Sequence, residues 1–451
     1  MERTILADLK EWKKSCDRKP LLLLGARQTG KTWILKEFGR ISFKNTRYFD
    51  FSEQNSSLSL VFSGNLDPDR ILKDLEIFLE ESIDLLNDLI IFDEIQEEPS
   101  ALKSLKYFHE KRPEVTLVAA GSLLGVSLSS ESFPVGKVNY LKMYPLSFHE
   151  FLRETAKEML FHEYEKALQT HQSSSLLHSR LMGHLRDYWI TGGLPAAVNA
   201  YMGNRENQLA AYSAARTVQN NLLKDYLNDF GKHAGKLNSN HIRYVFENIP
   251  LQLASFVDDS VKRYIFKDII PGKKGFSPVE GPLAWLEQAG LVYKVPVCNR
   301  AEIPLKAFTK PNMFKLHLFD IGLMGAMLEL SPKTILENSY GITKGFFAES
   351  FVMAELKKSI TTGIYSWTER NSEIEFMIYS DDSIIPIEVK AGNRTKAKSL
   401  ATYLTKYTSD PALKLMDCPL QPRGKSPIWN IPLYLSGRIP DLLKELPTNS
   451  G

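Results

Sequence analysis

Cysteine and long apolar runs are both scarce in this sequence. The chain has 451 residues and three cysteines, Cys16, Cys298 and Cys418, which lie far apart and form no C-x-x-C pair. This spacing argues against a disulfide framework and against a zinc site. No apolar run reaches the roughly 18 residues that would suggest a membrane span, and the N-terminal segment lacks the apolar core of a signal peptide. We therefore expect no membrane partner and a cytoplasmic location.

A strong charge of one sign is also absent. Lysine and arginine together number 56 against 53 acidic residues, which gives a net charge of +3. A balance this even does not by itself demand a nucleic-acid partner, so any basic surface has to be local. Hydrophobic residues make up 43% and charged residues 24%, as is usual for soluble globular proteins. A chain of this length exceeds one hydrophobic core, so roughly two to four domains are expected.

The first third of the chain alternates short apolar runs with helical patterns. Helices are predicted over residues 68–86 and 100–111, among others, and strands over residues 21–24, 48–51, 89–92, 116–120 and 140–143. Near-continuous apolar strands separated by helices favour a parallel sheet covered on both faces. The fold class predicted for this part is therefore α/β.

The pattern changes twice further along. Residues 149–230 are mainly helical, and in residues 283–295 a helix stops at Gly290 and a strand follows, as in a winged helix. The last third gives a helix, three strands and a basic helix. They are predicted at residues 346–359, 364–367, 374–379, 384–389 and 395–407.

A nucleotide-binding loop is predicted directly after the first strand. It fits the pattern G-x-x-x-x-G-K-[ST] between a strand and a helix. Its residues are Gly25, Ala26, Arg27, Gln28, Thr29, Gly30, Lys31 and Thr32. The glycines let successive backbone N–H groups face phosphates at a helix N-terminus. Lys31 is expected to place its charge on the β- and γ-phosphates of ATP, and the Thr32 hydroxyl is expected to ligate Mg²⁺.

Two acids end the third predicted strand, at the edge where open α/β sheets bind ligands. Asp93 is predicted to hold the Mg²⁺ shell, and Glu94 to orient and polarise the attacking water. Ser122 follows the next strand. It is a candidate for contact with the γ-phosphate or the water, and a helix-capping role fits it equally well. The predicted catalytic set is therefore Lys31, Asp93, Glu94 and Ser122, with ATP and Mg²⁺ as cofactors.

The sequence resembles a bacterial and archaeal AAA-type ATPase family from about residue 3 to residue 407. The segments that carry the resemblance are LLLLGARQTGKT, LIIFDEIQ, LVAAGSLLGVSL, YPLSFHEFL, YWITGGLPAAV and PIEVK. Many relatives have Gly-Arg where this chain has Gly136-Lys137. The resemblance implies a RecA-like ATPase core, a helical lid and winged-helix middle, and a C-terminal α/β domain similar to PD-(D/E)xK restriction endonucleases. The expected domains are residues 1–152, 153–230, 231–332 and 333–451.

Acidic residues and a lysine in the last third fit the nuclease motif. Glu375 and Glu388 lie on successive predicted strands, Lys390 follows Glu388 by two residues, and Glu349 lies on the preceding helix. Two carboxylates can hold a cation such as Mg²⁺, which polarises a phosphate and activates water. Lys390 shares a strand face with Glu388 and could stabilise the reacting phosphate. The usual first acid is Asp, so an inactive scaffold that only binds remains an alternative.

Two local clusters of basic residues suggest a DNA partner. Solvated helix faces are the competing interpretation. The clusters comprise Lys262, Arg263, Lys267, Lys273 and Lys274 in the middle of the chain, and Arg394, Lys396 and Lys398 near the end.

Two functions remain open at this point. The first is an ATP-driven motor that remodels or translocates on DNA, branched or broken DNA included, with a C-terminal domain that binds or cuts it. The second is a nucleotide-gated signalling or protein-remodelling ATPase with an inactive recognition domain. A ring-shaped homo-oligomer, a hexamer, is expected. Arg216, Arg263 and the weaker Lys137 are candidates to complete a neighbour's site.

Overall fold

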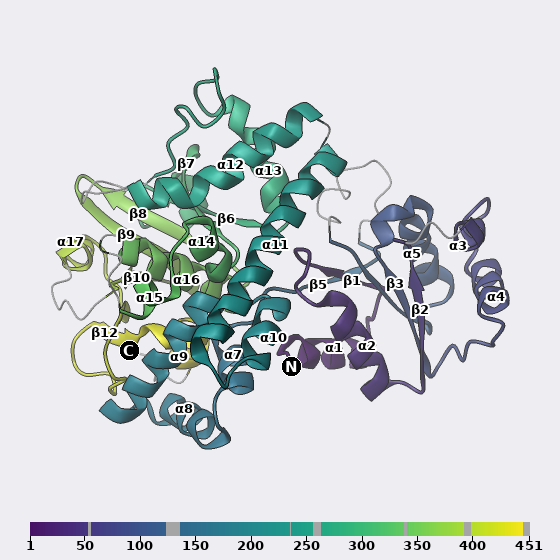
Figure 1. Cartoon of the computed structure of the whole chain (residues 1–451), viewed down its shortest axis with the longest axis horizontal. Helices are drawn as coiled ribbons and strands as arrows, with labels where there is room; N and C mark the ends of the chain where they lie inside the picture. Colours follow the sequence, from purple (N-terminus) through teal and green to yellow (C-terminus); the bar gives the residue numbers. More distant parts are fainter. Residues whose placement is uncertain are drawn as a thin grey trace. The chain divides into compact units, whose positions relative to one another are not determined.

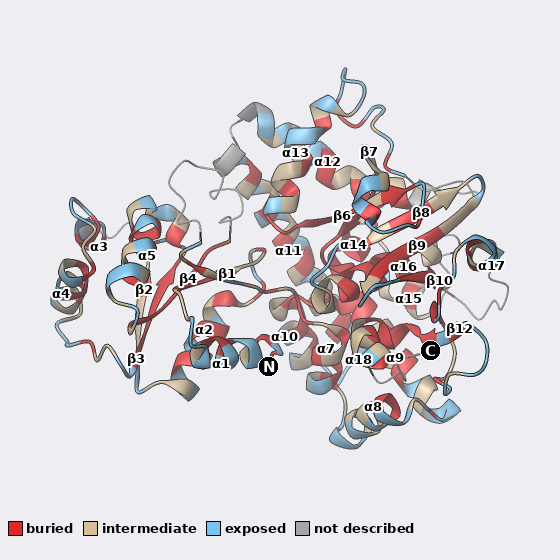
Figure 2. Cartoon of the chain, turned by 180° about the vertical axis from the view of Figure 1, so that it is seen from behind, coloured by how far each residue is buried: buried red, intermediate tan, exposed pale blue. Residues whose placement is uncertain are grey.

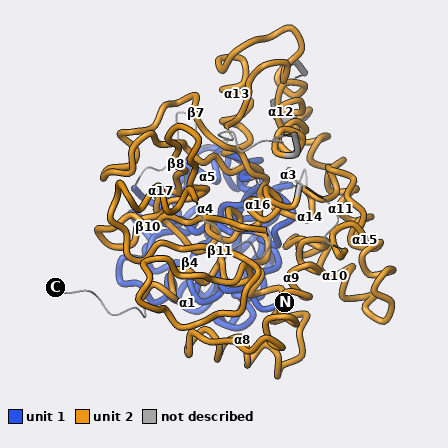
Figure 3. The backbone as a smooth tube through the Cα atoms, turned by 90° about the vertical axis from the view of Figure 1, so that its left-hand side faces the viewer, with its two compact units in different colours: residues 1–144, 288–290 blue, residues 145–287, 291–451 orange. Residues whose placement is uncertain are grey.

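The computed structural model divides the chain into two compact units (Figure 3). The first comprises Met1–Tyr144 with Gln288–Gly290, and the second comprises Pro145–Glu287 with Leu291–Gly451. The structure describes residues 1–52, 56–122, 136–234, 236–255, 263–337, 341, 343–391 and 398–444. Within these residues no helix is both long and apolar enough to cross a bilayer.

The first unit is built on a five-stranded parallel sheet (Figure 1). The strand order is β2-β3-β4-β1-β5, so β4 lies between the strand that leads into the predicted nucleotide loop and the strand that ends in the acid pair. The strands are β1 (Leu21–Leu24), β2 (Asn45–Asp50), β3 (Asp88–Asp93), β4 (Thr116–Ala120) and β5 (Asn139–Lys142). The predicted parallel α/β sheet is thereby confirmed.

Helices cover both faces of this sheet because successive residues of a strand point to opposite sides. Leu21, Leu23 and Ile91 pack with the helices of one face, while Leu22 and Phe92 pack with those of the other. On the first face lie α1 (Ile5–Lys14) and α2 (Lys31–Ser42). On the second lie α3 (Ser56–Val61), α4 (Pro68–Leu79) and α5 (Pro99–Lys111). Figure 2 shows how fully the central strands are buried.

One helix of this unit is shorter than predicted. The pattern suggested a helix over residues 68–86, but α4 ends at Leu79. Glu80 adopts a left-handed conformation with φ of 55°, and its N–H bonds back to the Glu76 carbonyl. A residue in this conformation closes the helix by supplying a donor to a carbonyl that the last turn leaves without one.

The second unit begins with helices and continues into a mixed seven-stranded sheet. The helices before the sheet are α7 (Phe148–Thr155), α8 (Glu158–Thr170), α9 (Ser175–Thr191), α10 (Pro195–Gly203), α11 (Gln208–Ala234), α12 (Lys236–Ser255) and α13 (Ser277–Gln288). The later helices are α14 (Ile321–Met327), α15 (Pro332–Leu336), α16 (Thr343–Ser359), α17 (Lys398–Lys406) and α18 (Ile439–Lys444).

The order of strands in this sheet joins two regions that were expected to form separate domains. The order is β12-β11-β10-β9-β8-β6-β7. The strands are β6 (Val292–Cys298), β7 (Thr309–Leu318), β8 (Tyr365–Glu369), β9 (Ser372–Ser380), β10 (Ser383–Val389), β11 (Ala412–Met416) and β12 (Ile428–Pro432). Because β6 pairs with β8, the hairpin β6–β7 from the expected winged-helix region extends the C-terminal sheet. The four expected domains thus fall into two compact units, and their boundaries stay predictions.

The hairpin between β9 and β10 forms as expected from its short polar connection. Ser380 pairs with Ser383, and Asp381 between them has a φ of 49°. A positive φ at this position matches the tight turns that connect antiparallel strands. The two strands are therefore antiparallel neighbours.

The three cysteines differ in their exposure. All three are free thiols, with Cys16 exposed, Cys298 buried and Cys418 half-buried.

Candidate functional site

The loop between β1 and α2 has the backbone shape of a phosphate-binding turn. Gly30, at the start of α2, has a φ of 93°. At Gly25 a side chain would not fit, because an added Cβ would lie 2.3 Å from the Met143 carbonyl oxygen. Both positions therefore require glycine, one for its conformation and the other for the close approach of β5. Gln28 also has a positive φ, of 62°.

Lys31 is buried at the centre of this loop. Its ammonium donates to the carbonyl oxygens of Gly25 at 3.0 Å and Ala26 at 2.9 Å. Burial lowers the pKa of Lys31 to about 8, although Glu94 and Asp93 act in the opposite direction. The loop thus places a cation where phosphate oxygens would otherwise meet only backbone groups.

An arginine that the sequence reasoning missed supports the loop from the N-terminus. The buried Arg3 guanidinium donates to the Thr29 carbonyl at 3.1 Å and to the Tyr144 carbonyl at 2.6 Å. Thr29 in turn donates through its hydroxyl to the Ala26 carbonyl at 2.9 Å. Arg3 and the Thr29 hydroxyl hold the loop carbonyls on one side of the loop. The loop N–H groups then face the other side, which favours the binding of an anion there.

Asp93 accepts hydrogen bonds from two hydroxyls, one in the first turn of α2 and one on β2. The Thr32 hydroxyl donates to Asp93 Oδ2 at 2.6 Å and the Tyr48 hydroxyl donates to the same oxygen at 3.0 Å. Burial raises the pKa of Asp93, while these hydrogen bonds lower it. Sequence reasoning missed Tyr48. No local signal points to Tyr48, because its role comes from the register of β2 and β3, in which Tyr48 lies opposite Ile91, two residues before Asp93.

Glu94 has a separate set of partners. The Ser122 hydroxyl donates to Glu94 Oε2 at 3.1 Å, and the Gln96 amide donates to the same oxygen at 2.6 Å. Arg27 of the nucleotide loop donates to Ser122 Oγ at 3.0 Å. Glu94 itself adopts a left-handed backbone conformation with a φ of 50°. Its side chain therefore does not continue the alternation of side chains along β3. Ser122 at the end of β4 therefore lies between the loop and the acid pair.

The residues of the first unit fit a magnesium nucleotide. Thr32 and Asp93 supply oxygen donors of the kind Mg²⁺ prefers, and they already lie 2.6 Å apart. The close-packed Gly25 and the left-handed Gly30 leave the loop backbone free to approach phosphates. ATP would be held by residues 25–32, and Mg²⁺ by Thr32 and Asp93.

In the second unit, Glu375 on β9 lies beside Glu388 and Lys390 at the end of the neighbouring strand β10. Lys390 Nζ lies 2.8 Å from Glu388 Oε1 and 3.8 Å from Glu375 Oε1. The backbone N–H of Val389 donates to Glu375 Oε2 at 3.2 Å. Burial raises the pKa of Glu375 to about 7, with Lys390 lowering it and Glu349 of α16 raising it again. These four side chains form what we call the acid–lysine cluster: Glu349, Glu375, Glu388 and Lys390.

Buried lysines that the sequence did not single out border this cluster. Lys414 on β11 lies opposite Glu388 in the strand register, and Lys315 on β7 forms an ion pair with Glu373. Burial lowers the pKa of Lys414, while Glu388 raises it. Across the residues that the structure describes, no group of three or more His, Cys, Asp or Glu side chains is arranged to hold a metal ion. Charge in this region is balanced mainly by ion pairs.

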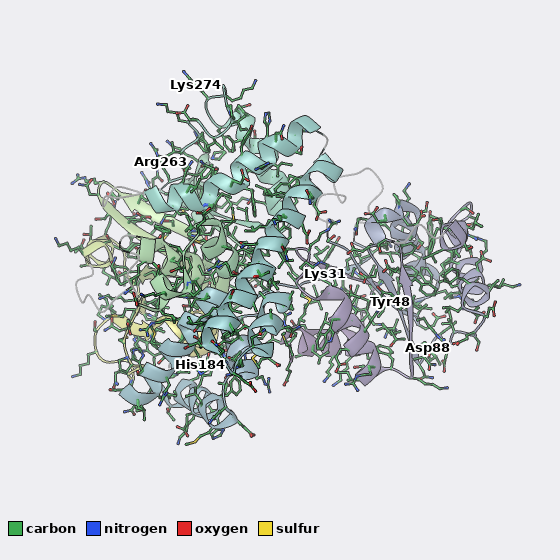
Figure 4. All side chains as sticks on the ribbon, in the orientation of Figure 1. Lys31, Tyr48, Asp88, His184, Arg263 and Lys274 are labelled. Atoms are coloured by element: carbon green, nitrogen blue, oxygen red, sulfur yellow. The ribbon has the colours of Figure 1, made fainter. Side chains whose placement is uncertain are left out.

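The predicted basic clusters are described only in part. Lys262, Arg394 and Lys396 lie outside the described residues. Lys267 pairs with Asp268 at 3.9 Å, while Arg263, Lys273, Lys274 and Lys398 are exposed. Figure 4 labels Arg263 and Lys274, with Lys274 at the outer end of its loop. The tyrosines of the basic helix are used for packing, since the Tyr403 ring lies 5.3 Å from that of Trp367.

The parallel sheet, the glycine-bounded loop and the acid pair beside it define a P-loop ATPase domain. In agreement, residues 17–152 match the family model described as an AAA domain, so the first unit holds an AAA-type P-loop domain. Residues 182–334 and 344–423 match models described as domains of unknown function (DUF8612 and DUF4143). No curated protein matches the chain.

Three solved structures illustrate what the chain is similar to. The ORC1 protein of Aeropyrum pernix in complex with DNA is 14% identical over 72% of this chain and 91% of that chain, with a TM-score of 0.29. A signal transduction ATPase with numerous domains from Pyrococcus horikoshii is 14% identical over 80% and 46%, with a TM-score of 0.28. PCH-2 of C. elegans is 12% identical over 47% and 65%, with a TM-score of 0.26.

Proposed function

We propose that this protein is a magnesium-dependent ATPase that couples nucleotide turnover to binding and remodelling of DNA, or to translocation along it, in the cytoplasm. One observation supports turnover above all. Asp93 and Glu94 are neighbours in sequence but have different partners, Thr32 for Asp93 and Ser122 for Glu94. Separate partners suit separate roles, one carboxylate for the metal shell and the other for water.

Each residue of the site has a role that follows from its position. On nucleotide binding, the Lys31 ammonium exchanges the loop carbonyls for the β- and γ-phosphate oxygens. The Glu94 carboxylate is held by Ser122 and Gln96. It orients the attacking water and polarises its O–H bond. Arg27 keeps Ser122 in place through its hydrogen bond at 3.0 Å. When bound, Mg²⁺ neutralises charge that develops on the phosphates.

A polynucleotide-stimulated ATPase assay tests the coupling to DNA. Phosphate release by the full chain is measured with Mg²⁺ and ATP, alone and with single-stranded, duplex or branched DNA. Stimulation by DNA that disappears in Lys31→Ala supports the proposal. Turnover that none of these DNAs changes argues for the second candidate function.

The acid–lysine cluster supports a DNA role for the second unit. Glu375 and Glu388 lie on antiparallel neighbours, as a phosphodiesterase site requires. Glu388 Oε2 is buried and has no hydrogen-bond partner among the described residues. A cation would satisfy this oxygen, so Glu375 and Glu388 would hold Mg²⁺ there, and Lys390 would face the phosphate.

The second candidate is a nucleotide-gated signalling or protein-remodelling ATPase with an inactive recognition domain. The close pairing of Lys390 with Glu388, at 2.8 Å, favours it, because the lysine then neutralises the carboxylate that a metal would need. Incubation of the protein with DNA and Mg²⁺ or Mn²⁺ distinguishes the two. An active site nicks DNA, loses nicking in Lys390→Ala and keeps it in Lys31→Ala. An inactive cluster gives no nicking, and Lys390→Ala then lowers stability or DNA affinity.

We also propose a ring-shaped homo-oligomer, a hexamer, in which a neighbouring subunit completes each nucleotide site. Arg216 donates to the carbonyls of Gly322 and Leu330, both at 3.2 Å, so its guanidinium serves its own unit. Lys137 pairs with Glu110 at 3.1 Å. Of the three candidates for this role, Arg263 alone has no partner among the described residues.

A further inference from the structure

The two places where the chain leaves the first unit both lie against the nucleotide loop. The chain leaves this unit after Tyr144 and, following a short return, again after Gly290. A Cβ added to Gly290 would lie 3.4 Å from the backbone nitrogen of Ala26. Met143, just before the first exit, packs so closely on Gly25 that its carbonyl leaves no room for a side chain there. Both exits therefore begin beside residues that are expected to hold ATP.

Arg3 ties the first exit to the nucleotide loop. Its side chain is buried, and its guanidinium donates to the Thr29 carbonyl at 3.1 Å and to the Tyr144 carbonyl at 2.6 Å. The Met143 N–H donates to the Leu24 carbonyl at 2.7 Å, which holds the same segment against the strand that enters the loop. Because a guanidinium is planar and rigid, a displacement of the Thr29 carbonyl would be passed on to Tyr144.

Beyond the exit, the backbone of Leu146 is held on both sides by the second unit. Its N–H donates to the Gly193 carbonyl at 2.7 Å. Its carbonyl accepts from the Tyr188 hydroxyl at 2.6 Å and from Lys358 Nζ at 2.9 Å. Leu146 lies in YPLSFHEFL, and Tyr188 and Gly193 lie in YWITGGLPAAV. Two segments of the family resemblance that take no part in the nucleotide site thus meet at this exit.

A buried ion pair on α16 holds the next residues. Glu355 Oε2 accepts from the Phe148 N–H at 3.1 Å, and Glu355 Oε1 lies 2.8 Å from Lys358 Nζ. Phe148 is the first residue of α7, so its N–H has no partner inside that helix. A buried ion pair is a weak source of net stability, and this one fixes the position of the backbone. We call Glu355 and Lys358 the α16 clamp.

The α16 helix also carries a member of the acid–lysine cluster. Glu349 lies six residues before Glu355, which is roughly 9 Å along a helix axis. A displacement of the α16 clamp would therefore move Glu349 with it. The second exit leads to the same region, because Val292, two residues after Gly290, begins β6 of the sheet that contains β9 and β10.

We infer that residues 143–148 and the α16 clamp couple nucleotide binding to the acid–lysine cluster, with Arg3 as the positioning residue at the nucleotide end. The inference rests on the proposed ATPase function and names the route by which ATP acts on the second unit. Bound phosphate stabilises one conformation of the loop, and Arg3 extends that stabilisation to Tyr144. The segment beyond it then opens less often.

Amide hydrogen exchange of the full chain, read by mass spectrometry, tests the inference. Glu94→Gln is used as the background to prevent turnover. ATP at about 100 times its Kd suppresses an opening that releases nucleotide by roughly 100-fold. Exchange at residues 145–150 and in α16 should therefore slow by roughly tenfold or more. In Arg3→Ala, with ATP again at about 100 times the Kd of that variant, the slowing should fall below about twofold.

Arg18→Ala is the matched control for Arg3→Ala. The Arg18 guanidinium also donates to two backbone carbonyls of the first unit, those of Pro113 and Glu114, but these lie outside the nucleotide loop and the exit. Its exchange should slow with ATP as much as that of the parent protein. Equal slowing in Arg3→Ala and Arg18→Ala would overturn the role of Arg3.

A variant of the α16 clamp tests the other end of the route. Glu355→Gln combined with Lys358→Met removes both charges together, so neither is left buried without its partner. ATP should still slow exchange at residues 145–150 in this variant, because Arg3 is unchanged, but no longer in α16. A melting curve and an ATP titration establish that the variant is folded. Slowing in α16 that persists would overturn the role of the clamp.

The outcomes separate this inference from the proposed function. If the protein binds no ATP, the proposed ATPase function fails and the inference fails with it. If ATP binds and exchange changes neither at residues 145–150 nor in α16, the inference alone is overturned. Slowing in both segments that depends on Arg3 and not on Arg18 supports it, whether or not the second unit binds DNA.

Discussion

Lys31 shows how a single side chain can prepare a site before its ligand binds. Its ammonium is buried and bonded to two loop carbonyls, and its pKa is lowered to about 8. A phosphate would replace neutral acceptors with charged ones, which strengthens each hydrogen bond. Loss of Lys31 should therefore reduce nucleotide affinity before it affects any later step.

The first prediction separates binding from turnover at the acid pair. Glu94→Gln should keep ATP affinity, because Lys31 and Asp93 are unchanged, and should lower the rate of hydrolysis by roughly 100-fold or more. Fluorescent-ATP titration and phosphate release measure the two quantities. Lys31→Ala is the contrasting variant, since it should lose affinity. Normal turnover by Glu94→Gln would remove Glu94 from the mechanism.

The second prediction concerns pH and Glu375. Burial raises the pKa of Glu375 from 4.5 to about 7, so the folded state binds this proton more tightly than the unfolded state. The contribution is fully present below pH 4.5 and is lost as pH rises through 7. The free energy of unfolding should fall by roughly 3 kcal/mol across this window because of this group alone.

Urea unfolding of the wild type and Glu375→Gln at several pH values measures this effect. The glutamine variant should show a smaller decrease in stability between pH 4.5 and pH 7, because it cannot titrate. Identical pH profiles for the two proteins would mean that Glu375 titrates as it would in the unfolded chain.

At the scale of elements, the register between β2 and β3 brings a phenol to the magnesium site. Burial and the nearby Asp93 raise the pKa of Tyr48, so its hydroxyl stays protonated and donates to Asp93. The Tyr48 hydroxyl also lies 3.3 Å from Asp50 at the end of its own strand. Tyr48 is therefore a positioning residue for Asp93.

The third prediction is that Tyr48→Phe raises the Mg²⁺ concentration needed for half-maximal nucleotide binding. The increase should be roughly two- to tenfold, as expected for one lost hydrogen bond. Nucleotide affinity without Mg²⁺ should stay unchanged. Tyr107→Phe on α5 is the matched control, away from the site. Equal Mg²⁺ dependence in both variants would show that Thr32 alone positions Asp93.

Local sequence could predict the elements but not their long-range pairing. The nucleotide loop was predictable because strand, glycines and helix start lie within one short segment, and the β9–β10 hairpin because its turn is short and polar. The pairing of β6 with β8 was not, since no local pattern encodes a partner far along the chain. For the same reason Tyr48 and Lys414 were missed, because their roles come from strand register.

At the scale of the whole molecule, the chemistry lies in two compact units. The nucleotide residues belong to the first, and the acid–lysine cluster belongs to the second. A motor or switch requires energetic coupling between its two units. Nucleotide binding to the first unit should therefore alter the ligand affinity of the second.

The fourth prediction concerns assembly. With ATP and Mg²⁺, and with Glu94→Gln used to prevent turnover, the protein should sediment as a hexamer. Without nucleotide it should be smaller. The expectation follows from the proposal that a neighbour completes each site, which makes ATP a ligand of the assembled form. Lys31→Ala should stay small under all conditions. A monomer at micromolar concentration with ATP would contradict the ring.

The uneven exposure of the three cysteines has a practical consequence. Cys16 is exposed on the first unit, while burial raises the pKa of Cys298 to about 12 and that of Cys418 to about 11. Thiolates, not thiols, react with maleimides, so these two should react far more slowly. The natural chain can therefore take a single dye on its ATPase unit without any engineered cysteine.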